Sequence, residues 1–140
     1  MIPDLQAAIL CDDVRQEKNG KFIVIGIFDG LSLPSLPFVL PRICLFSRWC
    51  CGQGRFTYQS RILAPDGQRV LAQGRGVPLT LNDDQRVATS VEFFVRLQIA
   101  EPGAHWIEIQ LDQQLKLRFP LHVRRVAQAA HPADGGESPP

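Results

Sequence analysis

The sequence lacks the motifs of the common metal, nucleophile and phosphate sites. Its four cysteines include no C-x2-C pair of the kind that binds zinc, and the adjacent Cys50 and Cys51 would face opposite sides of a strand. There is no G-x-S-x-G nucleophile motif, and none of the three histidines has a neighbour that predicts general-base chemistry. The glycine pairs at 52–54 and 74–76 lack the helix and lysine of a phosphate loop. We therefore expect a protein that is not an enzyme and that has no metal or cofactor.

An excess of charge and long hydrophobic runs are also missing. The net charge of +1 creates no overall field that would attract nucleic acid. Apolar runs such as Phe22–Phe28 are far shorter than the roughly 20 residues that a membrane helix needs. The first residues, MIPDLQ, show no basic region before an apolar core, so we expect no secretory signal. These features predict a soluble, cytoplasmic protein without a membrane partner, in which the cysteines are reduced and mostly buried.

Alternation of apolar and polar residues is the dominant pattern, and it predicts strands with one buried and one solvent-facing side. It runs through 55–62, 87–99 and 115–124, and no segment shows a convincing helical period. In 55–62 the even-numbered residues share one face. In 87–99 the odd-numbered residues, including Phe93 and Val95, are predicted to be buried, with Glu92 and Arg96 on the opposite side. Turn signals separate strands that lie near 5–14, 21–28, 42–51, 55–64, 68–74, 87–99, 105–111 and 115–125.

Seven or eight short strands at this spacing predict an all-β fold, specifically an antiparallel immunoglobulin-like β-sandwich. The length is that of one domain, which we expect over residues 1–126. Residues 127–140 lack apolar periodicity and are rich in proline, glycine and alanine, which predicts a disordered tail.

Three prolines interrupt the apolar segment Leu31–Arg42, LSLPSLPFVLPR. Because proline cannot donate to a β-ladder, this composition predicts an extended crossover or an irregular edge rather than a central strand. Pro34 and Pro37 match the P-x-x-P pattern, but neighbours such as Phe38 are too apolar for a solvated peptide ligand. We expect the crossover to pack over the edge of the sandwich. If it is exposed, Pro34, Pro37 and Phe38 are candidate residues of a partner or dimer surface.

Two adjacent acids, Asp12 and Asp13, interrupt the otherwise apolar first strand. The Asn19-Gly20 pair predicts a two-residue type I′ turn, which joins this strand to the next in a hairpin. That turn would pair Asp12 with Ile27 and Asp13 with Gly26. Asp12 would then lie on an apolar face of the hairpin.

A carboxylate on such a face is costly unless hydrogen bonds or a cation stabilise it. One solution is structural: a bulge near Cys11–Asp13, or an arginine such as Arg48 that reaches in. The other is functional, with the acid pair at the centre of a binding or metal-contacting loop. The candidate binding residues are then Asp12, Asp13, Arg15 and Arg48, and the sequence leaves both solutions open.

The run Cys11-Asp12-Asp13-Val14-Arg15, followed by Gly20-Lys21, resembles the CDD-x-R-x-E-x-x-GK hairpin that opens a bacterial family of small uncharacterised β-sandwich proteins. The stretch from Pro102 to Val123 is similar to the closing hairpin of many bacterial immunoglobulin-like modules, although Gln113 stands where an Asp-Gly turn is usual. The resemblance implies the fold and a bacterial, cytoplasmic origin. It implies no activity.

Together these features predict a non-catalytic module that binds another protein or itself, through the proline-rich crossover, an exposed sheet edge or the acid pair. One alternative is a Ca²⁺- or ligand-dependent domain, C2-like or carbohydrate-binding, that uses loop acids. Another is nucleic-acid binding through Arg42–Arg75, where six arginines accompany one acid, Asp66. Because strands ordinarily carry such charges on their solvent-facing side, we do not expect a nucleic-acid partner.

Overall fold

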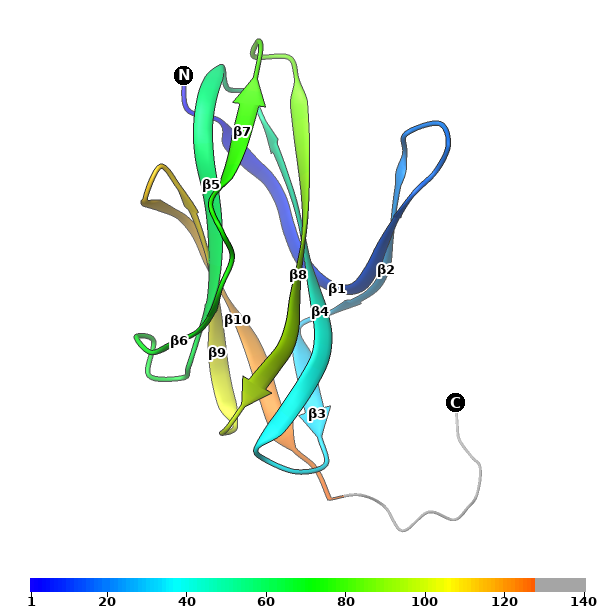
Figure 1. Cartoon of the computed structure of the whole chain (residues 1–140), viewed down its shortest axis with the longest axis vertical. Helices are drawn as coiled ribbons and strands as arrows, with labels where there is room; N and C mark the ends of the chain where they lie inside the picture. The colour runs from blue at the N-terminus through cyan, green and yellow to red at the C-terminus, as the bar shows by residue number, and fades with distance from the viewer. Residues whose placement is uncertain (128–140) are drawn as a thin grey trace.

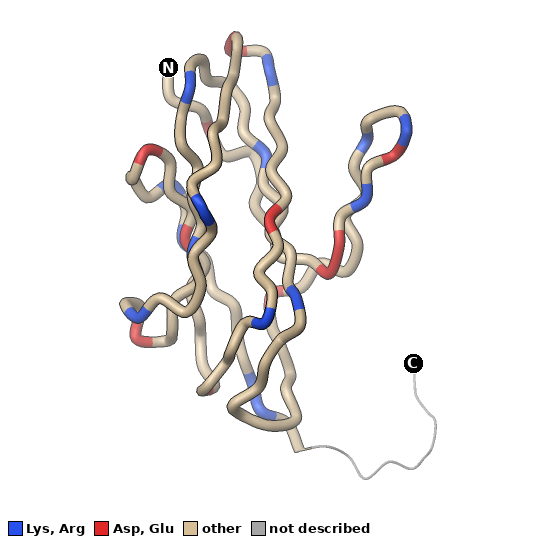
Figure 2. Tube along the Cα trace, in the orientation of Figure 1, with Lys and Arg blue, Asp and Glu red and all other residues tan. Residues whose placement is uncertain are grey.

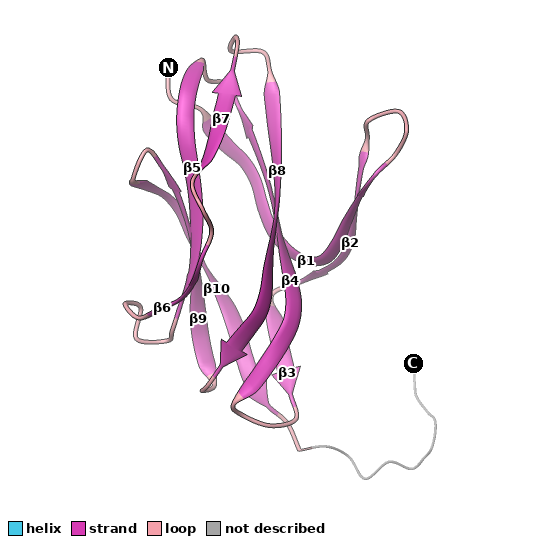
Figure 3. Ribbon diagram, viewed as in Figure 1, coloured by secondary structure: helices cyan, strands magenta, loops and turns pink. Residues whose placement is uncertain are grey.

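Two β-sheets pack face to face in the computed structural model, which describes residues 1–127 (Figure 1). One sheet has the strand order β2-β1-β4-β8, and the other has the order β3-β10-β9-β5-β6, with β7 also paired to β5. The described residues form strands and loops only, so the fold is all-β, as the alternation predicts (Figure 3). The strands are β1 Asp4–Gln16, β2 Phe22–Phe28, β3 Gly30–Leu33, β4 Phe38–Cys50, β5 Gly54–Leu63, β6 Val70–Gln73, β7 Val77–Leu81, β8 Val87–Ile99, β9 Gly103–Leu111 and β10 Gln114–Arg125.

All eight predicted strands are present, but the expected count was too low because β3 and β7 were missed. The expectation of a wholly antiparallel fold was also wrong, since β3 pairs in parallel with β10. Only Asp29 separates β2 from β3. The chain therefore crosses from the edge of one sheet to the edge of the other without a reversing turn, and it meets β10 in the same direction.

The core lies between the inner faces of the two sheets. Trp49 of β4 and Tyr58 of β5 are both buried, and their rings meet edge to face with centroids 5.8 Å apart. The predicted inner face of 55–62 is confirmed, because Tyr58, Ser60 and Ile62 are buried. Trp49 is thus a core residue.

The predicted faces of β8 are inverted over its first nine residues. Phe93 and Val95 are 44% and 60% exposed, whereas Phe94 between them is buried. Arg96 has a φ of 51°, and it lies opposite Pro41 because its neighbours pair across β4 as Arg42↔Val95 and Leu40↔Leu97. A left-handed residue breaks the alternation of a strand, so the strand faces exchange sides at this point. Beyond it, Leu97 and Ile99 are buried, as predicted.

The proline-rich segment is less of a crossover than its composition predicts. Its second half belongs to β4, but residues 38–42 of β4 pair with β8 alone among the described strands, so they lie at an edge of the sheet, as predicted. Pro41 is tolerated because β1 pairs with β4 only between Cys44 and Cys50, so β4 has a single neighbouring strand at Pro41. Phe38 is half-buried and packs against the core, as expected of a segment that covers the sandwich.

Three further expectations concern the cysteines, a membrane helix and the C-terminal tail. The four cysteines are free; two of them, Cys11 and Cys44, are buried, while Cys51 is exposed. None of the chain that the structure describes forms a helix with the length and apolarity of a membrane crossing. Apart from Ala127, the predicted tail of 127–140 lies outside the described residues.

Replacing Arg96 by glycine should increase the free energy of unfolding. Relief of the left-handed conformation of a side-chain-bearing residue outweighs the added entropy of the unfolded glycine, and we expect a net gain of about 0.5–1 kcal/mol. Urea denaturation measures this change. The control is Gln98→Gly at a nearby exposed position of β8, which should lose about 0.5–1 kcal/mol. If both variants lost the same amount of unfolding free energy, this would contradict the left-handed conformation at Arg96, where the faces of β8 exchange sides.

Candidate protein-binding surface

The hairpin formed by β1 and β2 bends away from the rest of its sheet (Figure 1). The pairing of β1 with β4 ends at Cys11↔Cys44, whereas the pairing of β1 with β2 continues to the hairpin turn. We call residues 12–27 the arm. Its side chains Val14, Phe22 and Val24 pack against the outer face of the four-stranded sheet, where they help to bury Cys11, Cys44 and Phe46. The rings of Phe22 and Phe46 meet edge to face at 5.9 Å.

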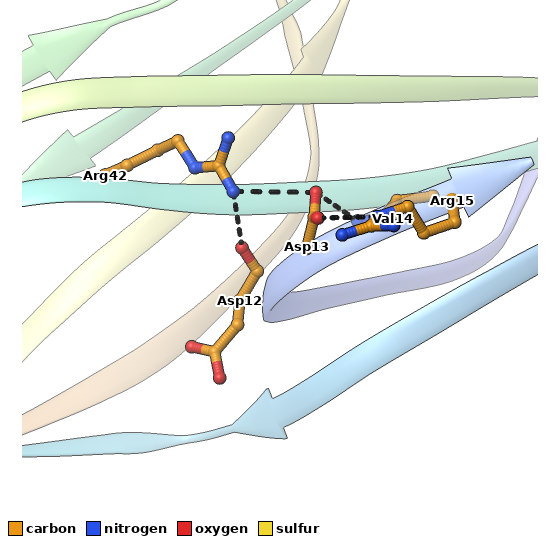
Figure 4. A network of polar contacts seen from close by, with 5 residues as sticks. All are labelled: Asp12, Asp13, Val14, Arg15 and Arg42. Atoms are coloured by element: carbon orange, nitrogen blue, oxygen red, sulfur yellow. Dashed lines mark hydrogen bonds and ion pairs between the residues drawn. The ribbon is translucent and has the colours of Figure 1, made fainter.

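The bend of the arm is held by a polar network around Asp13 (Figure 4). Asp13 Oδ1 accepts the backbone N–H of Val14 at 2.9 Å, and Arg15 Nε donates to Asp13 Oδ2 at 3.0 Å. Arg42 of β4 donates to the backbone oxygen of Asp12 at 3.4 Å and lies 3.5 Å from Asp13 Oδ1. The hydrogen bond from Arg15 lowers the pKa of Asp13, and the Val14 amide lowers it further. The network therefore fixes where β1 leaves the sheet.

This geometry corrects the predicted hairpin register by one residue. Cys11 pairs with Ile27 and Asp13 with Ile25, so Asp12 lies opposite Gly26. The turn is longer than the predicted two residues, because Glu17 N–H donates to the Lys21 carbonyl and the ladder ends at Gln16↔Phe22.

With the shifted register, side chains of the hairpin lie on the opposite face from the one predicted. Ile23, Ile25 and Ile27 are 45%, 41% and 64% exposed instead of buried, and Asp12 is exposed rather than on a core face. An arginine does contact the acid pair, and Gly26, which lies opposite Asp12, has a positive φ. However, the arginine is Arg42, and Arg48 lies farther along β4, opposite Ala7.

A groove of about 640 Å³ opens beside β8, between residues 91–95 of this strand and residues 72–77 of the β6–β7 segment. Glu92 points from β8 into the space between the sheets. Tyr58 Oη donates a hydrogen bond of 2.9 Å to Glu92 Oε1, and Ser60 Oγ donates to the same oxygen. A Cβ added to Gly74 would overlap the Glu92 carboxylate, so this glycine lets the two sheets approach. Burial, together with the Glu92 charge, raises the pKa of Tyr58.

Sequence reasoning missed Glu92, because it placed this residue on the solvent-facing side of its strand. One signal could have found it. Tyr58 and Ser60 are two hydroxyl groups on a predicted inner face, and buried hydroxyls require a hydrogen-bond partner from a facing element. The facing strand β8 supplies that partner.

The free edge of β8 is unusually open to another strand. β8 ends the order of its sheet, so one side of its backbone is unpaired within the described residues. Its stretch Val87–Val95 holds neither lysine, proline nor glycine, and its single charge, Glu92, is turned inward. Arg42 lies over the Phe93 ring, 4.6 Å from its centroid, and holds this exposed aromatic in place beside the edge. Natural edge strands usually carry lysines, prolines or bulges; this stretch has none of these, and its one charge, Glu92, is already held by Tyr58 and Ser60.

The remaining predicted binding residues are not brought together. The arginines between Arg42 and Arg75 are spread over both sheets rather than gathered on one face (Figure 2). Arg61 pairs with Glu108 at 2.7 Å, and Arg69 pairs with Glu101 at 2.7 Å. Pro34 and Pro37 lie in the loop between β3 and β4. This loop ends next to β8, where Phe38 pairs with Ile99.

The loop acids are likewise dispersed. Asp83 accepts the backbone N–H of Gln85 at 2.9 Å and thereby begins the turn before β8. In residues 1–127 no three histidine, cysteine or acidic side chains lie close enough to share a metal ion. The structure thus gives the calcium interpretation no assembled ligand set in the part it describes.

Comparison with known proteins identifies the family. DUF6941, described as a family of unknown function, matches residues 6–124. The chain belongs to this family. The match agrees with the uncharacterised family predicted from the hairpin, whereas the specific signature and the bacterial origin stay predictions. No curated protein matches the chain.

Several solved structures show a distant likeness in fold. Alkylpurine DNA glycosylase AlkC from Pseudomonas fluorescens, bound to DNA containing an abasic site analog, is 8% identical with a TM-score of 0.46, over 84% of this chain and 30% of that one. β-Glucosidase 3B from Thermotoga neapolitana, in complex with glucose, is 14% identical with a TM-score of 0.44, over 84% of this chain and 16% of that one. The chain spans less than a third of these proteins, and likenesses this weak carry no argument about function.

Replacing Gly26 by alanine should destabilise the bend of the arm. Gly26 has a φ of 69°, and a Cβ there would overlap the Asp12 carboxylate, so we expect a loss of about 1–3 kcal/mol in the free energy of unfolding. Urea denaturation measures the loss. Gly20→Ala is the control, because Gly20 also has a positive φ but open space around it. If both variants lost the same amount, the contact between Asp12 and Gly26 would have no energetic role.

The Asp13 network should make stability sensitive to acid. Because the pKa of Asp13 is lowered in the folded chain, its contribution is fully present above the unfolded value of about 3.9 and is lost as the pH falls through the folded value. Asp13→Asn should therefore lose less stability than the wild type between neutral pH and pH values below about 3.9. Urea midpoints across this range provide the measurement. Arg15→Gln should flatten the same part of the curve, and a curve unchanged in both variants would exclude the network as its source.

Proposed function

We propose that the chain is a non-catalytic protein-binding module that takes an extended polypeptide segment on the free edge of β8. The observation that carries this proposal is the unprotected stretch Val87–Val95 at the end of the four-stranded sheet. An unpaired strand edge offers alternating N–H and C=O groups to any extended backbone, and binding by strand addition uses these groups. The proposal includes the finer assignments of an immunoglobulin-like sandwich and of a bacterial, cytoplasmic setting.

The surroundings of the edge supply contacts for side chains. Phe93 and Val95 are exposed on the outer face, directly beside the free backbone. On the inner side, the groove holds the Glu92 carboxylate and is bordered by residues 72–77. A bound strand would therefore place alternate side chains on an apolar surface and toward a polar groove, which is how strand addition obtains specificity.

The other strand edges support this choice by contrast. β3, β6 and β7 have only four or five residues each, and β7 contains Pro78. β2 is interrupted by Gly26 with its positive φ. Shortness, proline and backbone irregularity are devices that discourage edge pairing. Unlike β2, β3, β6 and β7, β8 is a long edge that lacks these devices between Val87 and Val95.

The double variant Phe93→Lys/Val95→Lys should abolish partner binding without unfolding the chain. Both side chains are exposed, so two lysines beside the edge oppose pairing while the core is untouched. Tagged wild-type and variant chains are incubated with extract of the cells that produce the protein, and the captured proteins are quantified by mass spectrometry. We expect the specific partner to be captured at least about tenfold less by the variant.

Two matched variants control for non-specific binding through exposed apolar side chains. Leu115→Lys changes an exposed apolar residue at the β9–β10 hairpin, and Ile25→Lys changes one on the arm. Neither should alter capture. Amide hydrogen exchange of the complex should show new protection confined to β8. Capture that is insensitive to the edge variant, or protection elsewhere, would refute the proposed function.

A further inference from the structure

We infer that the segment bound on β8 is the β8 of a second copy of the chain, in an antiparallel pair centred on Val91. This inference rests on the strand-binding function proposed above and names its partner. The outcome is a twofold dimer in which the two four-stranded sheets join into one continuous sheet.

The outer face of the strand is self-complementary in this register. When Val91 meets Val91 of the second copy, Val87 lies opposite Val95 and Thr89 lies opposite Phe93, and each contact occurs twice. Val87, Phe93 and Val95 are 47%, 44% and 60% exposed in the single chain, so the residues that would gain partners are those that lack cover. Apolar and aromatic pairs directly across an antiparallel ladder are the contacts that stabilise such sheets.

The inner face fits the same register. Ala88 lies opposite Phe94 of the second copy, which pairs a small side chain with a large one. Ser90 lies opposite Glu92 of the second copy, so its hydroxyl can donate to a carboxylate that already accepts from Tyr58 and Ser60. An ionised carboxylate has about four acceptor positions, and two donors leave room for a third. The register therefore leaves no like charges directly opposite each other.

Backbone geometry selects this register over a second one. A pair centred on Phe94 would place Glu92 opposite Arg96 of the second copy, which is favourable for charge. That register, however, would carry the ladder through Arg96, whose φ of 51° departs from an extended strand. The register centred on Val91 uses only Val87–Val95, and it stops before the break in both copies.

Closure of the assembly favours a second copy over an unrelated strand. A twofold contact pairs the β8 edge of one copy with the β8 edge of the other, so neither edge remains free to bind a further strand. The edge strands β2, β3, β6 and β7 are short or interrupted, and they do not invite further growth into a fibre. One open edge of this kind is what a closed dimer requires.

The register predicts a charge-swap experiment on the full chain. Val87→Lys/Val95→Lys places like charges opposite each other twice, and Val87→Lys/Val95→Glu places opposite charges there instead. Both positions are exposed, so neither variant disturbs the core. Sedimentation equilibrium over a wide concentration range should show the wild type approaching twice its chain mass of 15.6 kDa. We expect dimer dissociation to be at least about tenfold easier for the Lys/Lys variant, and within about threefold of wild type for the Lys/Glu variant.

Each other outcome overturns the inference in a recognisable way. A wild-type chain that stays monomeric while the Phe93→Lys/Val95→Lys variant still loses a captured partner excludes the second copy and leaves strand binding in place. A dimer that the Lys/Lys variant does not weaken, or one that the Lys/Glu variant does not restore, excludes this β8 register. A monomer whose captured proteins are also insensitive to the edge variant refutes the inference and the proposed function together. Leu115→Lys serves again as the control for added charge.

Discussion

The pairing of β4 with β8 is the interaction on which the rest of the structure depends. These strands run side by side along nearly their whole length, from Phe38↔Ile99 to Cys50↔Val87. β4 also carries β1, and through it the arm, so the four-stranded sheet is assembled around this one strand. The same ladder decides which residues of β8 reach the core and which remain outside.

One local break divides that ladder into two regions with different roles. Pro41 in β4 and Arg96 in β8 lie opposite each other, and the faces of β8 exchange sides there. Beyond the break, Leu97 and Ile99 close the core. Before it, Phe94 and Glu92 point inward while Phe93 and Val95 point outward, which produces the apolar outer surface and the polar groove at once. The binding surface that we propose is thus a direct consequence of where the strand changes sides.

Much of the fold could be predicted because alternation is a local property. The stripe of β5 with Tyr58 and Ile62, and the later part of the β10 stripe with Leu121 and Val123, follow from period-2 patterning. Prediction failed where a single residue changed the alternation of inward- and outward-facing side chains. A longer turn moved the hairpin register by one position and exposed Ile25, and the left-handed Arg96 inverted the stripe of β8. A shift of one residue turns every side chain of a strand to the other face.

The sequence by itself determined that this protein is built from strands and where eight of them lie, and it offered an arginine or a bulge as one of two solutions for the acid pair. Only the tertiary structure decided that Arg42 is that arginine, that Glu92 joins the two sheets through Tyr58 and Ser60, and that β8 is left as the open edge. The physical reason is one of range. Side-chain alternation is fixed by the backbone of each strand, whereas strand order and the partner of a buried charge depend on segments that meet only after the chain has folded.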